Sequence, residues 1–256
     1  MRDMNSQEEQ LALQMIGLLD LTSLNTDDNE ARVITLCRRA ITPVGEVAAV
    51  CVFPHFVKLA RRTLDDLRAD AVRVSSVANY PYGGSNLLSA VSETRAALAS
   101  GADEISLVYP YRLHLTGNKQ GTKDLVAACK ETCGDRAVLK VILETGELRD
   151  PQIIRNVCMD MFAAGADFVE TSTGKVIVNA TPQAARIILE VIAEAGGQGG
   201  FKAAGGIRTF DEARVYLDLA KARFGPHWVS VNSVRLGAGS LLDDLLTHLG
   251  VLAPGR

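Results

Sequence analysis

The stretch ADFVETSTGK, residues 166–175, places a carboxylate at the end of an apolar run. Phe168 and Val169 lead directly into Glu170, which is followed by hydroxyl residues, a glycine and a lysine. A buried carboxylate is costly unless it is paired. Other apolar runs also carry a polar residue, namely Asp20, Cys51, Ser106, Lys140 and Lys202. Each alone is explained by an ion pair or hydrogen bond inside the protein. Together they indicate an acid–base site, because clusters of ionisable groups in one pocket are more often functional.

Three glycine-containing turns indicate an anion-binding site. TSTGK (171–175), AAGGIR (203–208) and RLGAGS (235–240) each follow an apolar run and precede helix-forming sequence. Backbone N–H groups at such turns, together with Lys175 or Arg208, suit a phosphate group. One Gly-Gly turn usually does no more than connect a strand to a helix. Three such turns at neighbouring strand ends favour phosphate binding.

Alternating apolar and amphipathic segments must position these groups. The apolar runs predict strands at 17–24, 47–53, 71–78, 104–110, 138–145, 167–173, 200–206 and 233–239. Amphipathic stretches at 86–102, 151–166, 181–196 and 209–225 predict helices, several with a capping residue at the start and glycine at the end. Strand followed by helix, repeated about eight times, predicts a (β/α)8 TIM barrel, an α/β fold with a single domain over residues 1–256. An open doubly wound sheet is the alternative, but no G-x-G-x-x-G follows the first strand.

A short sequence pattern that occurs twice predicts which side chains face the same way. SGADEISLVYP (100–110) and AGADFVETSTG (164–174) share a Gly-Ala-Asp triplet, and superposing the triplets places Ser106 opposite Glu170. Side chains alternate along strands, so both residues should face the barrel interior. The same alternation makes Lys140 and Lys202 candidates for that interior.

The composition argues against several classes of function. The chain has 256 residues, 47% hydrophobic and 22% charged, which is typical of an enzyme-sized globular domain. A net charge of −3 offers no basic surface for nucleic acid or an anionic membrane. No apolar run reaches transmembrane length, and MRDMNSQEEQ is too polar for a secretory signal. The five cysteines include no metal-type C-x-x-C pair, which predicts reduced thiols in the cytoplasm.

Characteristic segments occur along nearly the whole chain, among them LLDLTSLN, TPVGEVAAVCVFPHF, YPYR, DLVAACKE, LKVILETGEL, TSTGK, GFKAAGGIRT and GAGSLL. These segments resemble the 2-deoxyribose-5-phosphate aldolase family, in its enterobacterial-like branch. The resemblance implies a (β/α)8 barrel in carbohydrate metabolism that reversibly cleaves 2-deoxyribose 5-phosphate into glyceraldehyde 3-phosphate and acetaldehyde. It implies a lysine Schiff base and no metal or cofactor, and it is compatible with a monomer or a homodimer.

The resemblance breaks at two catalytic positions. The family's Schiff-base lysine stands directly before TSTGK, where this chain has Glu170, and its proton-relay aspartate corresponds to Ser106. A carboxylate cannot form an imine, so the family mechanism cannot run at position 170. The second family lysine is matched by Lys202, the aspartate of the first strand by Asp20, and the cysteine of AVCVF by Cys51. Gly239 replaces a serine of the last phosphate turn, and the final VLAPGR lacks the family's C-terminal tyrosine.

The predicted catalytic residues are Glu170, Lys202, Asp20, Ser106, Lys140 and Cys51. The predicted substrate- and phosphate-binding residues are Thr22, Thr171, Gly174, Lys175, Gly205, Gly206, Arg208, Gly237 and Ser240. We expect a lyase-family enzyme acting on a small phosphorylated or otherwise anionic carbonyl compound, by carbon–carbon cleavage, proton transfer or cyclisation, with Schiff-base aldolase activity weak or lost. Three alternatives stay open: a non-catalytic phosphate-ligand-binding paralogue, an aldolase whose imine lysine has moved to Lys202, and an ordinary aldolase whose lysine was deliberately replaced.

Overall fold

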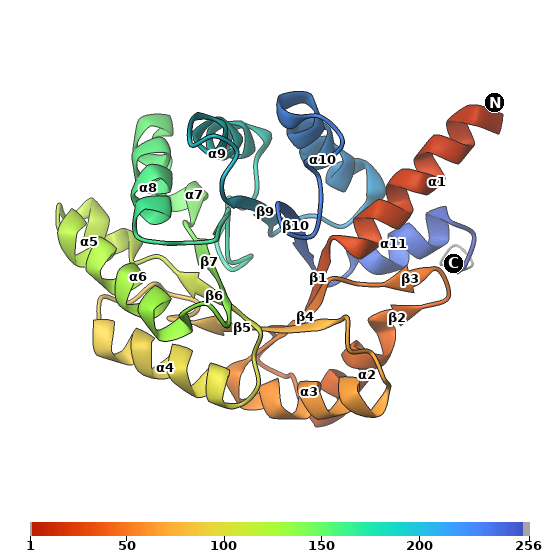
Figure 1. Cartoon of the computed structure of the whole chain (residues 1–256), viewed down its shortest axis with the longest axis horizontal. Helices are drawn as coiled ribbons and strands as arrows, with labels where there is room; N and C mark the ends of the chain where they lie inside the picture. Colours follow the sequence, from red (N-terminus) through yellow and green to blue (C-terminus); the bar gives the residue numbers. More distant parts are fainter. Residues whose placement is uncertain (1, 253–256) are drawn as a thin grey trace.

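Eight parallel strands close into a barrel in the computed structural model, which describes residues 2–252 (Figure 1). The order around the barrel is β1-β10-β9-β8-β7-β6-β5-β4. The strands are β1 (Leu19–Thr22), β4 (Ala49–Val52), β5 (Arg73–Ala78), β6 (Glu104–Val108), β7 (Val138–Ile142), β8 (Phe168–Glu170), β9 (Gly200–Ala204) and β10 (Val234–Ala238). This architecture confirms the predicted (β/α)8 barrel, because each predicted strand segment contains one of the eight strands.

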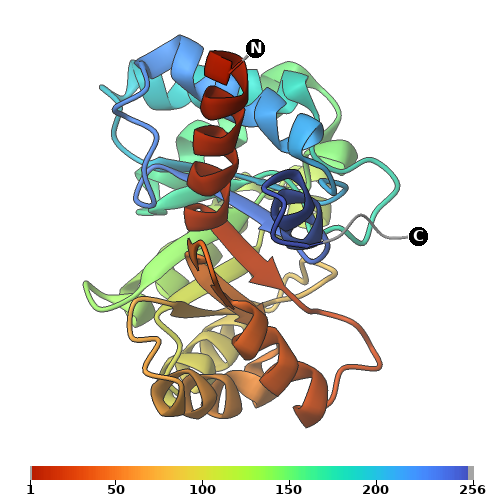
Figure 2. The same ribbon diagram turned by 90° about the vertical axis from the view of Figure 1, so that its right-hand side faces the viewer.

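Helices surround the barrel and follow the strands along the chain (Figures 1 and 2). They are α1 (Arg2–Gly17), α2 (Glu30–Arg39), α3 (Val57–Asp66), α4 (Leu87–Ala99), α5 (Tyr111–Leu115), α6 (Lys119–Cys133), α7 (Thr145–Leu148), α8 (Pro151–Ala163), α9 (Pro182–Glu194), α10 (Phe210–Phe224) and α11 (Leu241–His248), with a 3-10 turn, η1 (Pro54–Phe56). A short antiparallel hairpin, β2 (Ile41–Thr42) and β3 (Gly45–Glu46), precedes β4. The sequence did not predict α1, whose C-terminal end leads into β1 (Figure 2).

Four of the predicted helices begin at side-chain caps. Asn86, Asp150, Thr181 and Thr209 each accept a hydrogen bond from a backbone N–H in the first turn of α4, α8, α9 and α10. Glu212 completes a capping box with Thr209. Such caps satisfy N–H groups that have no partner within the helix. The predicted starts of these helices are therefore confirmed.

The apolar core lies between the barrel and its helices. Strand residues such as Leu107 and Val141 are fully buried and belong to the same cluster as Ile188 and Leu217 from the helical layer. Parallel strands covered on both faces read as nearly continuous apolar runs, which explains the pattern of the sequence. Among residues 2–252, no helix combines the length and apolar character needed to cross a membrane.

The repeated Gly-Ala-Asp triplet has a structural cause. Asp103 accepts a hydrogen bond from the N–H of Val74 at 2.8 Å, and Asp167 accepts one from the N–H of Leu139 at 2.7 Å. Each aspartate therefore ties the start of its own strand to the preceding strand, at the end of the barrel where strands begin. The shared role sets a common register, so the residues three positions later face the same way.

Strands β7 and β8 end three residues before their predicted segments do, and both ends shape the site. The segment predicted at 138–145 leaves the sheet after Ile142, and Glu144 adopts a left-handed conformation with φ +60°. The segment predicted at 167–173 leaves the sheet after Glu170. The Thr171 hydroxyl then bonds to the backbone of Ala204 at 3.0 Å, both as donor and as acceptor. The residues that follow turn outward around a cavity.

Candidate active site

A cavity of about 550 Å³ lies at the carboxyl ends of the barrel strands. Enzymes with this fold place their active sites at that end of the barrel. The predicted residues that line it are Thr22, Cys51, Ser106, Glu170, Gly174, Lys175, Lys202, Gly205, Gly206, Arg208, Gly237 and Ser240. Asp20, Lys140 and Thr171 do not line it; they lie buried beneath or behind its surface. The cavity therefore brings together most of the residues selected from the sequence.

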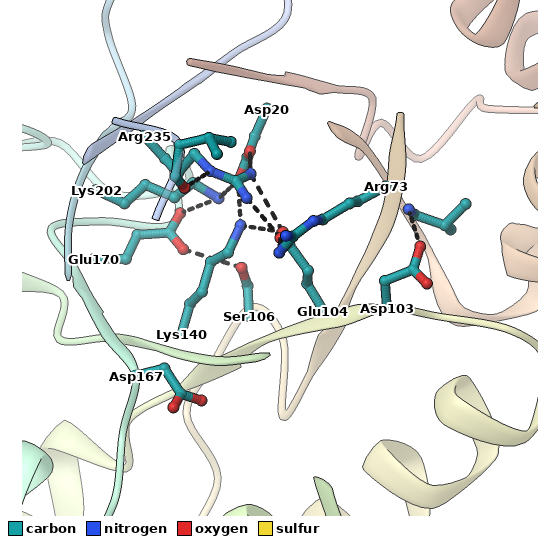
Figure 3. A network of polar contacts seen from close by, with 12 residues as sticks. Asp20, Arg73, Asp103, Glu104, Ser106, Lys140, Asp167, Glu170, Lys202 and Arg235 are labelled. Carbon is teal, nitrogen blue, oxygen red and sulfur yellow. Dashed lines mark hydrogen bonds and ion pairs between the residues drawn. The ribbon is translucent and has the colours of Figure 1, made fainter. Parts of the chain in front are cut away.

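Glu170 forms part of the cavity floor and is only 4% exposed. The Ser106 hydroxyl donates a hydrogen bond to Glu170 Oε2 at 3.0 Å, and Lys202 Nζ lies 3.2 Å from Glu170 Oε1 (Figure 3). Strand register explains both contacts, because Glu170 is directly opposite Lys202 across β8 and β9, and β6 presents Ser106 to the same interior. Both oxygens of the carboxylate are thus held in place, one by a hydroxyl and one by an ammonium group.

Asp20 supports Lys202 from below. Its Oδ2 lies 2.9 Å from Lys202 Nζ and 2.6 Å from Lys140 Nζ. Asp20 and Lys140 are both fully buried, so neither can contact a ligand without movement of the floor. Asp20 thus joins the two lysines, and Lys202 is the one of the three that lines the cavity.

Two buried groups at the site were missed by the sequence analysis. Arg235 on β10 contacts Asp20 at 2.5 Å and Glu104 at 2.7 Å, and Lys140 lies 2.5 Å from Glu104 (Figure 3). Glu104 precedes Ser106 by two positions, so the alternation that selected Ser106 was a usable signal for it. Arg235 lies in a segment predicted both as a strand and as a phosphate turn, but the sequence analysis did not place its side chain in the interior.

These contacts define a buried charge network made up of Asp20, Glu104, Glu170, Lys140, Lys202 and Arg235. The network contains three carboxylates and three basic groups, so its formal charges balance. Arg73, whose side chain is 38% exposed, contacts Glu104 at 3.1 Å and marks the outer edge of the network. Each buried charge therefore has a partner of opposite sign, as a low-dielectric interior requires.

The network divides the carboxylates into two kinds. Burial opposes ionisation of Asp20, but Lys140, Lys202 and Arg235 outweigh it and hold the pKa of Asp20 well below its usual range. For Glu170, burial dominates and raises the pKa, with Lys202 offsetting only part of the effect. Burial also opposes the charged form of Lys202, yet Asp20 and Glu170 outweigh it and raise the lysine pKa. Glu170 is thus the group in the floor that can gain and lose a proton, while Lys202 stays charged.

Cys51 lies on an apolar wall of the cavity. It packs with Leu24 and Val77, and burial raises the pKa of its thiol to about 11. The thiol is therefore protonated at neutral pH and unsuited to act as a nucleophile. All five cysteines are buried and unpaired. Within residues 2–252, no group of three or more His, Cys, Asp or Glu side chains is placed to hold a metal ion.

The glycine turns form a cup of unpaired backbone donors. Gly174, Gly205, Gly206 and Gly239 line the cavity, and none of their N–H groups has a hydrogen-bond partner among the described residues. Gly205 has φ +87°, and a Cβ there would lie 2.7 Å from Asn179 Oδ1, so the close approach requires glycine. Buried backbone donors are normally paired, so converging unpaired ones suit an anionic ligand.

Basic side chains add positive charge to the cup. Lys175 and Arg208 line it, and neither side chain forms an ion pair within the described part of the chain. Arg39 from α2 lines the same cavity and contacts Asp243 at 2.6 Å. The sequence analysis missed Arg39, because only the closed fold brings α2 beside the last turn. We call Gly174, Lys175, Gly205, Gly206, Arg208 and Gly239 the anion cup.

The remaining predicted binding residues have structural contacts. Thr22 lines the cavity and donates to the backbone carbonyl of Asp20 at 2.8 Å. Gly237 makes room for the floor, because a Cβ at this position would lie 2.9 Å from Lys202 Cε. Ser240 lines the cavity at the start of α11. Thr171 binds the backbone of β9 and joins two strands instead of facing the cavity.

Comparisons with known proteins agree with this architecture. Residues 14–226 match the model of the DeoC/LacD family of aldolases. A Toxoplasma gondii ME49 protein assigned as a deoxyribose-phosphate aldolase is 23% identical, with a TM-score of 0.87 over 96% of both chains. A Coccidioides immitis protein with the same assignment is 25% identical, with a TM-score of 0.76 over 94% of this chain and 95% of the other. The tetrameric deoxyribose phosphate aldolase of Aeropyrum pernix is 24% identical, with a TM-score of 0.75 over 98% and 99% of the two chains.

Proposed function

Because this chain belongs to the DeoC/LacD family of aldolases, we propose that it is an enzyme acting on a small anionic carbonyl compound by proton transfer at Glu170. Lys202 serves as a charged electrophile, and Schiff-base aldolase activity is weak or absent. The observation that carries this proposal is the 3.2 Å contact between Lys202 and Glu170 inside a charge-balanced, buried network. Carbon–carbon cleavage or cyclisation is the class of reaction that such a proton transfer serves.

The state of Lys202 argues against an imine. An amine must lose its proton before it attacks a carbonyl, and Asp20 and Glu170 both stabilise the protonated form. The same ammonium group, which lines the cavity, is suited to stabilise negative charge on a carbonyl oxygen. We therefore assign Lys202 the role of oxyanion stabiliser.

Glu170 supplies the complementary group. Its raised pKa suits a carboxylate that takes a proton from the carbon next to a carbonyl. In that step the C–H bond breaks, its electron pair forms the enolate, and the proton moves to Glu170 while Lys202 stabilises the enolate oxygen. Ser106 donates to the other carboxylate oxygen and keeps the acid–base group in one orientation.

The anion cup defines the substrate class. Unpaired backbone donors and the Lys175 and Arg208 side chains favour a phosphate or similar dianion. The apolar wall formed by Leu24, Cys51 and Val77 favours a small, unbranched remainder of the substrate. We also propose that the protein is of the enterobacterial-like branch, works in the cytoplasm and assembles as a homodimer.

Glu170→Gln should slow proton exchange by about 10²–10⁴-fold, the usual contribution of a general base. The probe is glyceraldehyde 3-phosphate in D2O, with deuterium uptake next to the carbonyl followed by NMR. Because the pKa of Glu170 is raised, exchange by the unmodified protein should increase as pH rises through that value, and the variant should show no such step. Exchange that is unchanged in Glu170→Gln would contradict the proposal.

Borohydride treatment distinguishes the alternatives. With acetaldehyde or glyceraldehyde 3-phosphate present, we expect no reduced adduct in the mass spectrum, because Lys202 is charged. A covalent adduct that disappears in Lys202→Ala would show that the imine lysine has moved. Anion binding without exchange or adduct, for every carbonyl compound tried, would instead identify a non-catalytic binder.

Arg208→Gln should weaken binding of inorganic phosphate by about tenfold or more, because a charge-assisted hydrogen bond is lost. Isothermal titration calorimetry provides the measurement. The matched control is Arg214→Gln in α10, where the arginine contacts Glu8 and Asp211 and does not line the cavity. Equal losses of phosphate affinity in the two variants would mean that the loss comes from the lower positive charge of the protein and not from a contact in the anion cup.

A further inference from the structure

Glu144 lies behind the TSTGK turn and does not line the cavity. It follows β7 with φ +60° and ψ +59°, a backbone conformation that is uncommon for residues other than glycine, asparagine and aspartate. Its side chain is fully buried. Among the side chains described at 7–252, no basic group lies within ion-pair distance of its carboxylate. A buried carboxylate on a strained backbone persists only where its surroundings require it.

The partner of this carboxylate is the turn that carries the anion cup. The Thr173 hydroxyl donates to Glu144 Oε2 at 2.6 Å, and the Thr173 N–H donates to Oε1 at 3.3 Å. Thr173 Oγ1 in turn accepts the N–H of Lys175 at 3.1 Å. A hydroxyl has one proton, so giving it to Glu144 leaves the oxygen lone pairs for Lys175. A hydrogen-bonded chain thus runs from Glu144 through Thr173 to Lys175.

These hydrogen bonds determine which groups of the TSTGK turn are available to a ligand in the cavity. Gly174 lies between the two bonded residues; it lines the cavity, and its N–H has no hydrogen-bond partner among the described residues. The Lys175 N–H is held inside the turn, which leaves its side chain as the contribution of that residue to the cup. A third tie comes from the Tyr80 hydroxyl, which donates to the carbonyl of Thr173 at 3.3 Å.

We propose that Glu144 is a positioning residue, which acts through Thr173 to hold Gly174 and Lys175 in the conformation that receives the anionic group of the substrate. This inference rests on the proposed function, in which the cup binds that group. Glu144 positions the turn in its ionised form, because the carboxylate accepts both Thr173 donors and orients the hydroxyl proton away from Lys175. Protonation supplies a competing donor and weakens the chain.

Several titratable groups face Glu144 and set the direction of its pH response. Burial raises its pKa; the two Thr173 hydrogen bonds act against this, and Glu147 and Glu170 add to it. Tyr80 and Tyr111 also face it and are themselves neutral at ordinary pH, because burial raises their pKa values. Glu170 titrates in the opposite sense for anion binding, because its protonation makes the cavity more positive. The pH test therefore needs a background without that carboxylate.

The first measurement is a double-mutant cycle on sulfate affinity, followed by calorimetry. Sulfate remains a dianion at neutral and mildly acidic pH, unlike phosphate. Glu144→Gln and Thr173→Val should each weaken sulfate binding by about tenfold, since the first replaces one of the two acceptor oxygens by a donor and the second removes the hydroxyl. The double variant should bind as each single variant does, because the two residues act as one unit. Thr173→Ser keeps the hydroxyl and should bind as the unmodified protein does.

The second measurement is the pH dependence in a Glu170→Gln background. Sulfate affinity should fall as pH is lowered through the raised pKa of Glu144, because protonation of this carboxylate weakens its hold on Thr173. Adding Glu144→Gln should remove this slope. If Glu144 had a purely structural role, Glu144→Gln would lower the thermal midpoint but would leave the pH dependence of sulfate affinity unchanged.

Three results would overturn the inference: unchanged sulfate affinity in the folded single variants, additive losses in the double variant, or Thr173→Ser binding as poorly as Thr173→Val. If the parent binds sulfate and any of these results is obtained, only the role of Glu144 is overturned. No sulfate binding by the parent would overturn both this role and the anion cup of the proposed function.

Discussion

Glu170→Lys combined with Ser106→Asp should raise cleavage of 2-deoxyribose 5-phosphate from a negligible rate by about 10²–10⁴-fold or more. In the parent, three buried carboxylates balance Lys140, Lys202 and Arg235, and Asp20 and Glu170 raise the pKa of Lys202, so that this lysine stays protonated. The double substitution leaves three carboxylates facing four basic groups. One lysine then lacks a buried counter-charge, and burial drives it toward the neutral amine that forms an imine.

The assay couples release of acetaldehyde or glyceraldehyde 3-phosphate to a dehydrogenase. Either single substitution is a control, because only the pair restores both the nucleophile and the proton relay. Brisk cleavage by the parent that is lost in Lys202→Ala but kept in Glu170→Gln would show an ordinary aldolase with a relocated lysine. It would also show that the proposed role of Glu170 is wrong.

Arg235→Ala should lower the free energy of unfolding by about 3–5 kcal/mol, the usual effect of breaking a buried ion pair. Arg235 contacts Asp20 at 2.5 Å and Glu104 at 2.7 Å, and its side chain is 1% exposed. Its removal takes a shared basic partner from two buried carboxylates, leaving Asp20 with Lys140 and Lys202 and leaving Glu104 with Lys140 and the partly exposed Arg73. For a chain of this size the melting temperature should fall by about 10 °C, measured by calorimetry.

Arg73→Ala is the matched control. Arg73 contacts the same carboxylate, Glu104, but its side chain is 38% exposed, so solvent replaces much of the interaction. We expect a change of about 1 kcal/mol or less. Similar losses in the two variants would mean that the interior does not depend on charge balance.

Much of the fold and part of the candidate site could be predicted from the sequence. The alternation of strands and helices predicted the barrel, because parallel pairing needs crossovers that only a few architectures provide. The period of two along strands predicted the inward facing of Ser106, Lys140, Glu170 and Lys202, and the structure brings these side chains together. Their catalytic roles stay predictions.

The site residues that the sequence analysis missed depend on how deep they lie in the barrel and on contacts between segments far apart in the sequence. Alternation says which way a side chain faces, but the tilt of the strands decides which inward residues share a level. Arg235 and Glu104 meet Asp20 for that reason. Arg39 reaches the cavity from a helix about 200 residues away from the turn that it joins, a proximity that only chain closure creates. The ends of β7 and β8 depend on local conformations, such as that of Glu144, which no periodic pattern reveals.

The charge balance of the buried network also limits how this barrel can change its chemistry by single mutational steps. Introducing lysine at position 170 first would leave Asp20 and Glu104 with four basic neighbours, so two amines would have to be neutral in the interior. Introducing aspartate at position 106 first would place it beside Glu170, where two adjacent carboxylates would compete for one proton. Either intermediate is poorer in stability than both end points. Evolutionary divergence between an imine-forming barrel and this one therefore favours paired substitutions. The lower stability of the singly substituted proteins selects against the one-step route.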